Sequence, residues 1–156
     1  MPAGFESTAG LAEYFAYYLS RSGFPVTAVT ERTGDLFPLV REAGKDVHIL
    51  ALLLPRYPKQ LVDFCTHCRL KGAQLTIIAD APDHPLQGQA EYEFYVSQRR
   101  VQGMNLESQI AMLAVIQMLI QEAGLSDRER TRQSLEELEE YNRRFQLFND
   151  TGVTGH

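Results

Sequence analysis

The chain has no tryptophan, only two cysteines in 156 residues, and no excess of positive charge. Its 15 lysines and arginines are outnumbered by 20 aspartates and glutamates, which gives a net charge of −5. Because nucleic-acid binding relies on basic side chains that neutralise phosphates, no nucleic-acid partner is expected for this chain. Cys65 and Cys68 are too close in sequence to form a long-range disulfide framework. A reducing, cytoplasmic location is therefore expected.

Long hydrophobic runs are also absent. The longest dense apolar stretch runs from Ile110 to Ile120, contains Gln117, and is shorter than the roughly 20 residues that span a bilayer. No basic segment followed by an apolar run opens the sequence, so neither a secretory signal nor a membrane partner is expected. The length fits about one domain. We assign it to residues 1–149 and predict that residues 150–156 form a disordered tail.

Several catalytic signatures are missing. The sequence has no Walker or dinucleotide glycine pattern and no G-x-S-x-G elbow, so we assign no cofactor and no catalytic residue. Cys65 and Cys68 have C-x-x-C spacing, but a redox motif places its first cysteine at a helix N-terminus. The helix predicted to carry both cysteines is expected to begin near Pro58, so Cys65 lies inside it. A zinc site needs four ligands, and the histidines are scattered. We interpret both cysteines as structural and predict no metal site.

The most informative stretch runs from Asp46 to Asp80. It reads as a strand over Val47–Leu54, a turn over Pro55–Pro58, a helix over Lys59–Leu70 and a strand over Ala73–Ala79. The first strand is apolar at nearly every position, which indicates helices on both faces of a parallel sheet. The predicted class is α/β: a doubly wound, flavodoxin-like, mostly parallel sheet flanked by helices.

Periodicity and turn residues place the remaining elements. Further helices are expected over Thr8–Ser22, Leu36–Ala43, Asn105–Ala123 and Ser126–Phe148, and further strands over Pro25–Thr30 and Tyr92–Ser97, the latter at an edge. The first strand is short or missing, since few residues precede the first helix. Ser7 or Thr8 should cap that helix, Gly23 should end it, Asn105 is the expected cap of the apolar helix, and Ser126 with Glu129 forms a capping box for the last.

The two C-terminal helices differ in surface character. The helix from Asn105 is apolar nearly all round, so we expect the sheet and another subunit to bury it. The long last helix is charged, with one apolar stripe. It either packs on its own domain or crosses to a partner.

Two turns are candidate ligand loops, because ligands of such sheets bind beyond the carboxyl ends of the strands. The small residues and hydroxyls of Gly4, Glu6, Ser7 and Thr8 suit an anion-binding turn at a helix N-terminus, although an ordinary capping loop has the same composition. Arg56 and Tyr57 lie between two prolines, where the arginine fork suits a phosphate or carboxylate. The alternative is a surface pair on a tight connection.

Other polar residues have weaker claims. Glu6, Glu91, Glu93 and Glu107 are candidate general bases near element ends, or else caps and surface residues. His48 is expected to be a hydrogen-bonded core histidine, and His84 a loop residue within reach of a ligand.

Four segments in order resemble the sugar-isomerase (SIS) domain, and specifically the C-terminal SIS domain of RpiR-type transcriptional regulators. They are Gly4–Thr8 with Leu11–Tyr14, Arg56–Val62 with Arg69–Ala73, Ile78–Leu86, and Leu135–Phe148. The third is similar to the family's T-D-x-x-x-S-P-L loop. The family's S-x-S-G-x-S/T phosphate loop would fall at Leu53–Pro58, where the sequence offers no hydroxyl except that of Tyr57.

The resemblance implies a domain that dimerises through helices and binds a phosphosugar or sugar-acid-like metabolite, with Asp80 joining the two turns as a ligand residue. Our hypothesis is an effector-sensing and dimerisation module of an RpiR-like regulator, with the DNA-binding domain absent from this chain. One alternative is an aldose–ketose phosphosugar isomerase in which Glu107 removes a proton. A third reading is a dimerisation module with a vestigial pocket.

Overall fold

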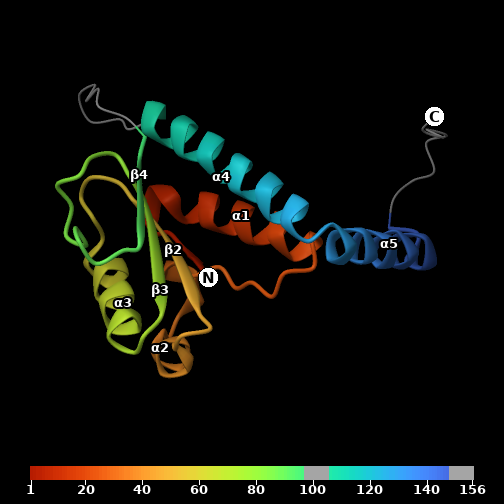
Figure 1. Cartoon of the computed structure of the whole chain (residues 1–156), viewed down its shortest axis with the longest axis horizontal. Coiled ribbons are helices and arrows are strands. Elements are labelled where there is room, and N and C mark those ends of the chain that lie inside the picture. The colour runs from red at the N-terminus through yellow and green to blue at the C-terminus, as the bar shows by residue number, and fades with distance from the viewer. Residues whose placement is uncertain (97–105, 148–156) are drawn as a thin grey trace.

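The computed structural model describes residues 1–96 and 106–147 of the chain (Figure 1). Four parallel strands form one sheet in the order β1-β2-β3-β4: β1 (Pro2–Ala3), β2 (His48–Leu53), β3 (Gln74–Ala79) and β4 (Tyr92–Tyr95). The α-helices are α1 (Ala9–Arg21), α2 (Phe37–Glu42), α3 (Lys59–Leu70), α4 (Leu106–Ser126) and α5 (Arg128–Phe145). Short 3₁₀ turns, η1 (Glu6–Thr8) and η2 (Glu31–Thr33), complete these elements. The predicted parallel α/β class is confirmed.

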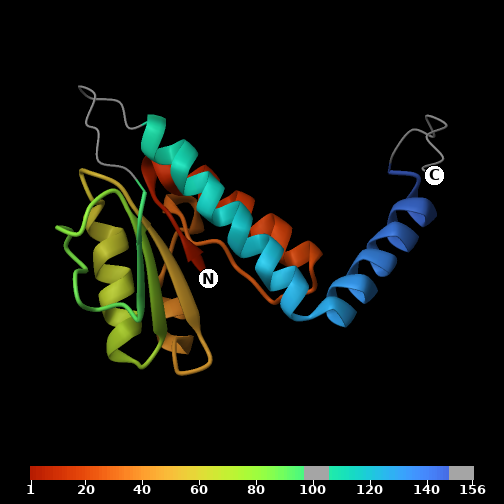
Figure 2. The ribbon, with the colours of Figure 1, turned by 45° about the horizontal axis from the view of Figure 1, so that its top comes forward.

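Helices cover both faces of the sheet. In Figures 1 and 2, α1 and α4 lie side by side over one face, and α2 and α3 lie on the other. Strand β2 shows why its sequence is apolar after His48. Its alternate residues Ile49, Ala51 and Leu53 belong to the core beneath α3, whereas Leu50 and Leu52 belong to the core beneath α1 and α4. Both sides of the strand are therefore buried, as its composition predicts.

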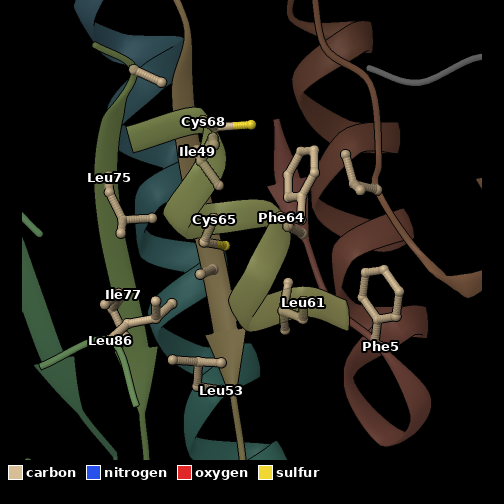
Figure 3. Close-up of a cluster of buried hydrophobic side chains, with 14 of the residues drawn as sticks. Phe5, Ile49, Leu53, Leu61, Phe64, Cys65, Cys68, Leu75, Ile77 and Leu86 are labelled. Atoms are coloured by element: carbon tan, nitrogen blue, oxygen red, sulfur yellow. The ribbon is translucent and has the colours of Figure 1, made fainter. Parts of the chain in front are cut away.

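Helix α3 has the predicted bounds and carries the core of its face. Leu61, Phe64, Cys65 and Cys68 of α3 belong to this core together with Leu86 from the loop between β3 and β4, which Figure 3 shows beside Ile77. Both cysteines are fully buried and unbonded to each other. Burial raises the pKa of the Cys65 thiol strongly and that of Cys68 to about 11. Buried thiols with raised pKa values are poor nucleophiles, in agreement with a structural role.

The strand predicted over Pro25–Thr30 is wrong. That segment makes a single parallel bridge, from Val29 to Ala3, and the remainder is irregular. The bridge is nevertheless informative, because it places the segment on the outer side of β1 while β2 pairs with the inner side. The chain thus winds outward through α1 and returns through α2. Strand β1 is the point at which the winding direction reverses.

Helices α4 and α5 meet at a sharp corner. Asp127 is the single residue between them, and its carboxylate accepts a hydrogen bond from the Arg130 amide at 3.1 Å. The predicted Ser126–Glu129 capping box is therefore wrong: the Ser126 hydroxyl donates instead to the Ala123 carbonyl. At the first helix the cap falls on Thr8 as expected, but its side chain makes no capping bond. Gly23, with φ of 80°, follows α1 in the left-handed conformation expected of a C-terminal stop.

Helix α4 is half covered. Met112, Ile116 and Ile120 pack on the sheet, and Gln117 accepts a hydrogen bond of 2.7 Å from the Tyr14 hydroxyl of α1. The opposite face of α4 is exposed in the single chain. The predicted cover of this face by a second subunit stays a prediction. Residues 107–126 are long and apolar enough to span a membrane by length and composition, but packing on the sheet accounts for the apolar buried face. Asn105, Ser97 and the predicted tail lie outside the described residues.

Candidate functional site

The reversal at β1 brings two strand-to-helix loops together at the carboxyl edge of the sheet. The first loop, Gly4–Thr8, follows β1, and the second, Leu54–Pro58, follows β2, which pairs directly with β1. Asp80 follows β3, the next strand along. Ligands of doubly wound sheets bind outside the strand ends at such a reversal. All seven residues predicted from sequence therefore lie on loops at this one edge.

The first loop is held by internal contacts. The Thr8 hydroxyl is buried, accepts a hydrogen bond from the Phe5 amide at 3.1 Å, and lies 3.0 and 3.1 Å from the carbonyls of Phe5 and Leu52. Its single proton can serve only one of those carbonyls at a time. Gly4 is packed so closely that a Cβ would lie 2.5 Å from the Thr8 carbonyl oxygen. Gly4 and Thr8 thus shape the loop and tie it to β2.

Glu6 and Ser7 form the exposed part of the first loop. Glu6 has φ of 53°, a left-handed conformation that is uncommon outside glycine. Its amide donates to the Glu31 carboxylate at 3.2 Å, while the Ser7 carbonyl accepts a hydrogen bond from the Gln109 side chain at 3.3 Å. One N–H group of this turn therefore already donates its hydrogen bond to a carboxylate oxygen. The contact joins residues 25 positions apart, and no local pattern in the sequence predicts it.

The second loop places Arg56 at its tip. Arg56 is exposed, and its φ of 77° lies in the region that favours glycine. In the S-x-S-G-x-S/T pattern aligned to Leu53–Pro58, position 56 is the glycine. The loop thus has a backbone that favours glycine at the position where the pattern has a glycine, while it presents a guanidinium group. Among the described residues, no carboxylate lies within 4 Å of the Arg56 side chain.

Tyr57 connects the second loop to the loop after β3. Its hydroxyl donates to a carboxylate oxygen of Asp80 at 3.2 Å and lies 3.5 Å from the Asp83 carbonyl. Asp80 is buried, whereas Tyr57 is half-buried. Helix α3 begins at Lys59 just beyond this contact, and no side chain caps its N-terminus. The structure therefore joins Tyr57 and Asp80 directly, next to a helix end whose dipole favours anions.

His84 differs from the expectation. It is a buried residue rather than a loop residue open to ligand, and neither ring nitrogen has a hydrogen-bond partner in the described chain. Its Nε2 lies 3.6 Å from the Glu93 carboxylate, which also accepts hydrogen bonds from the Tyr95 hydroxyl and from the Gly88 amide at 3.3 Å. These contacts hold the loop between β3 and β4 against the sheet.

The other candidates have structural partners or lie apart. His48 is hydrogen-bonded, to Gln74 and Thr76, but it is exposed rather than in the core. Glu91 accepts from the Leu75 amide at 2.7 Å and pairs with Arg69, and the amide bond is the main cause that lowers the pKa of Glu91. Glu107 is exposed in the first turn of α4. Within residues 1–96 and 106–147, no cluster of three or more acidic, cysteine or histidine side chains suits a metal ion.

A large cavity of about 780 Å³ lies elsewhere. It is lined by the first residues of the strands, such as His48 and Tyr92, and by Phe15, Leu119 and Arg130 from the helices. These residues mark the amino edge, at the opposite end of the strands from the candidate loops. The cavity and the residues predicted from sequence therefore do not coincide.

Doubly wound α/β domains bind their ligands beyond the carboxyl edge of the sheet at the reversal point, which is where this chain has its two loops and Asp80. The model of the SIS domain family matches residues 4–121 of the sequence, which includes both loops and Asp80. The chain therefore belongs to the SIS domain family. A search of curated proteins finds no match to the sequence.

Solved structures share the fold. The sugar isomerase domain of an RpiR transcription factor from Sphaerobacter thermophilus superimposes with a TM-score of 0.80 at 19% identity, over 89% of this chain and 76% of that one. NanR of Vibrio vulnificus, complexed with ManNAc-6P, gives 0.71 at 16% identity, over 95% of this chain and 56% of NanR. A sugar-phosphate isomerase assigned in Listeria monocytogenes gives 0.70 at 17% identity, over 85% and 71%. These likenesses extend the resemblance to RpiR-type domains at the level of the fold.

Proposed function

We propose that the chain is the effector-sensing module of an RpiR-like transcriptional regulator and binds a phosphosugar or a sugar acid at the carboxyl edge of its sheet. The observation that carries this proposal is the backbone of Arg56. Arg56 has a left-handed backbone, which favours glycine, at the position where the resembled phosphate-loop pattern has a glycine, although the short hydroxyls of that pattern are gone. The NanR fold neighbour, whose structure contains ManNAc-6P, supports a ligand of this class.

In this proposal the candidate residues bind different chemical groups of the ligand, according to their own charge. The Arg56 guanidinium suits the phosphate or carboxylate group, with the N-terminus of α3 beside it. Asp80 and Glu6 are acceptors for sugar hydroxyls, and Ser7 offers a further hydroxyl. Tyr57 orients Asp80 through the bond of 3.2 Å. Gly4 and Thr8 have the supporting role of shaping the first loop.

The proposed regulation works through differential affinity. A ligand that bridges the two loops favours the arrangement in which both are ordered, and thereby shifts the orientation of whatever the domain is attached to. In this proposal the chain works in the cytoplasm as a homodimer and makes no direct contact with DNA or membrane. A separate DNA-binding domain of the regulator would contact the DNA.

A thermal-shift screen tests the ligand assignment. The panel contains sugar phosphates, including ManNAc-6P, and the corresponding sugar acids, at concentrations well above their dissociation constants. Binding to the folded state alone raises the melting temperature, by an amount that grows with ligand concentration. The shift is expected to shrink in Arg56→Ala and to persist in Arg41→Ala, a matched exposed arginine on α2. A panel without any shift contradicts the proposal, as does an unchanged response in Arg56→Ala.

The isomerase alternative makes a separate prediction. Its fold neighbour from Listeria monocytogenes is assigned as a sugar-phosphate isomerase, and Glu107 would be the base. Proton removal beside a carbonyl exchanges the C2 hydrogen of a bound aldose phosphate with solvent. Exchange in deuterium oxide that is lost in Glu107→Gln would establish the enzyme reading. Binding without exchange supports the sensor, and a dimer without any ligand response supports a purely structural module.

A further inference from the structure

The amino half of the sheet is incompletely covered on the face that carries α1 and α4. Leu50, Thr76 and Tyr92 are register partners there. Alternation along the strands puts them on the same side as Leu52 and Ile78, which pack against α4. In Figures 1 and 2 the C-terminal ends of α1 and α4 lead away from the strands toward α5. The cavity of about 780 Å³ lies between those helix ends and the amino half of the strands.

The interior of this cavity is mostly apolar. Its walls include Phe15 and Leu19 of α1, Phe24 from the segment that follows, and Leu119 and Ala123 of α4. Where the strands begin, the Thr76 hydroxyl lies 2.8 Å from one ring nitrogen of His48, and the other ring nitrogen lies 3.2 Å from the Gln74 carboxamide oxygen. These polar groups therefore satisfy one another. Water inside the cavity finds few hydrogen-bond partners, so an apolar group that displaces it gains affinity.

Arg130 of α5 provides a positive charge at the rim. Its guanidinium stacks on Phe24 at 4.9 Å from the ring centroid, and its Nε lies 3.3 Å from the Asp127 carboxylate. Within residues 1–96 and 106–147 the guanidinium makes no hydrogen bond, so its two Nη groups can bind a ligand. Asp46, also at the rim, is exposed before the start of β2. A planar guanidinium suits a carboxylate, which accepts two parallel hydrogen bonds from it.

A sugar phosphate does not suit this cavity. Its hydroxyls would lose water without gaining protein partners, and burial of an unpaired hydroxyl is costly. A volume of about 780 Å³ with apolar walls and few polar groups is instead typical of sites for largely apolar small molecules. Arg130 at the rim favours a negatively charged head group on such a molecule.

We propose that the cavity is a ligand site separate from the candidate loops, and that it binds an amphipathic monocarboxylate such as a medium-chain fatty acid. The apolar body lies between the strands and the ends of α1 and α4, and the carboxylate accepts hydrogen bonds from the Nη groups of Arg130. The site goes beyond the proposed function and does not depend on it, because it lies at the amino edge of the sheet whereas Arg56 and Asp80 follow the carboxyl ends of the strands.

Calorimetric titration with hexanoate, octanoate, octanol and octylamine tests the ligand class. Octanoate should bind, and each methylene group added between hexanoate and octanoate should lower the dissociation constant about fourfold, as for burial of one methylene. Octanol lacks the charge and octylamine has the opposite charge, so both should bind about fivefold more weakly than octanoate, or weaker still. Octylamine binding as tight as that of octanoate would place the head group at Asp46 and overturn the proposal.

Methyl NMR spectra of the unsubstituted protein locate octanoate without any risk of misfolding. Octanoate should shift the methyl resonances of Leu19, Leu50 and Leu119, which line the cavity. The methyl resonances of Leu61 and Leu75, in the core beneath α3, should stay unchanged. Shifts of equal size at all five leucines would indicate binding without a defined site and would overturn the proposal.

Two tryptophan variants of α4 separate the cavity from the helix surface. Ala123→Trp puts an indole into the cavity and should abolish octanoate binding, whereas Ala114→Trp, at an exposed position of the same helix, should preserve it. Because the chain has no other tryptophan, fluorescence reports on each site, and the emission of Ala123→Trp should lie at the shorter wavelength. Equal octanoate affinity in the two folded variants contradicts the proposal.

Arg130→Gln tests the contact with the head group. The dissociation constant for octanoate should rise about tenfold, as for loss of a charge-assisted hydrogen bond, while that for octanol should stay the same. Arg128→Gln, at the exposed first residue of α5, is the matched control and should leave both constants unchanged. An equal loss for octanol and octanoate in Arg130→Gln would mean that the arginine only supports the cavity wall, and the carboxylate contact would be wrong.

Competition separates this site from the proposed function. A sugar phosphate at the carboxyl edge should not displace octanoate, and Arg56→Ala should leave octanoate affinity unchanged. If none of the four probes binds at millimolar concentration, the cavity site is removed, and a protein segment or a second copy of the chain becomes the candidate that covers it. The thermal-shift response to sugar phosphates then still decides the sensor proposal. Octanoate binding in a chain that responds to no sugar phosphate does the reverse.

Discussion

The two loops at the reversal point reach their shapes by different means. In the first loop, Gly4 lies against the Thr8 backbone and the Thr8 hydroxyl ties the turn to β2. In the second, two prolines flank a tip at which Arg56 adopts a conformation that glycine accepts more readily. The first loop is therefore set by packing and has little freedom to change. The side chains of the second differ from the resembled phosphate-loop pattern, so we expect ligand specificity to reside there.

The largest effect is expected from a Cβ in the first loop. In Gly4→Ala the new carbon would lie 2.5 Å from a backbone oxygen, and the required backbone shift should lower the free energy of unfolding by about 3 kcal/mol. Arg56→Gly is the matched change in the second loop. It removes left-handed strain of about 1 kcal/mol but adds a similar freedom to the unfolded chain, so its net effect should be close to zero.

Urea denaturation of the two variants checks this difference. The midpoint should fall for Gly4→Ala and stay nearly constant for Arg56→Gly, with unchanged slopes. Gly10→Ala, at a helical glycine with open space around it, is the control for adding a methyl group. Equal losses in Gly4→Ala and Arg56→Gly would show that the second loop is as tightly packed as the first.

Ligand affinity should show the opposite order. Arg56→Ala removes the guanidinium and keeps the Cβ, so the dissociation constant for the tightest sugar phosphate or sugar acid should rise about 10- to 30-fold, which corresponds to about 1.5–2 kcal/mol for a charge-assisted hydrogen bond. Calorimetric titration measures it. Arg56→Lys, which keeps the charge without the planar fork, should recover part of the loss. Full affinity in Arg56→Ala would place the anion elsewhere.

The parts of this fold that periodicity specifies were predictable. Helix α3 has the expected bounds because a proline, an apolar pattern and Gly72 delimit it, and β2 is recognisable because its side chains from Ile49 to Leu53 are buried on both faces. Ser126 was mistaken for a cap because Asp127, one residue later, competes for the same role. The segment around Val29 has the composition of a strand, but its pairing with β1 depends on the tertiary arrangement and reduces to one bridge.

The candidate site was only partly predictable. Sequence places Gly4, Arg56 and Asp80 at strand ends, and the topology brings those ends to one edge. The hydrogen bond from the Glu6 amide to Glu31 and the burial of His84 depend on side chains that meet across loops. No local spacing encodes such contacts. The left-handed conformation of Arg56 has no signal in the residue itself, since arginine does not favour it.

A smaller effect is expected where the second loop meets Asp80. Tyr57→Phe deletes the hydroxyl that donates to Asp80 at 3.2 Å, and loss of one such bond should lower the free energy of unfolding by about 1 kcal/mol. Because the Asp80 carboxylate is then also free to rotate, the free energy of ligand binding should weaken by a similar amount. Tyr92→Phe, on the exposed edge strand, is the control. A loss of stability without any loss of affinity would mean that Asp80 does not contact the ligand.

The smallest effect concerns the carboxylate that occupies the first loop. Glu31 accepts from the Glu6 amide at 3.2 Å and is exposed, so an anionic ligand at this edge must approach a like charge. Glu31→Gln removes that charge, and the affinity for a doubly charged sugar phosphate should rise two- to threefold, about 0.5 kcal/mol, as for an exposed charge pair. The gain should fade as salt increases, because exposed charges are screened. Glu139→Gln on α5 should leave the affinity unchanged. A gain that persists at high salt would indicate a structural change in the first loop, and the absence of any gain would place the anion at the second loop alone.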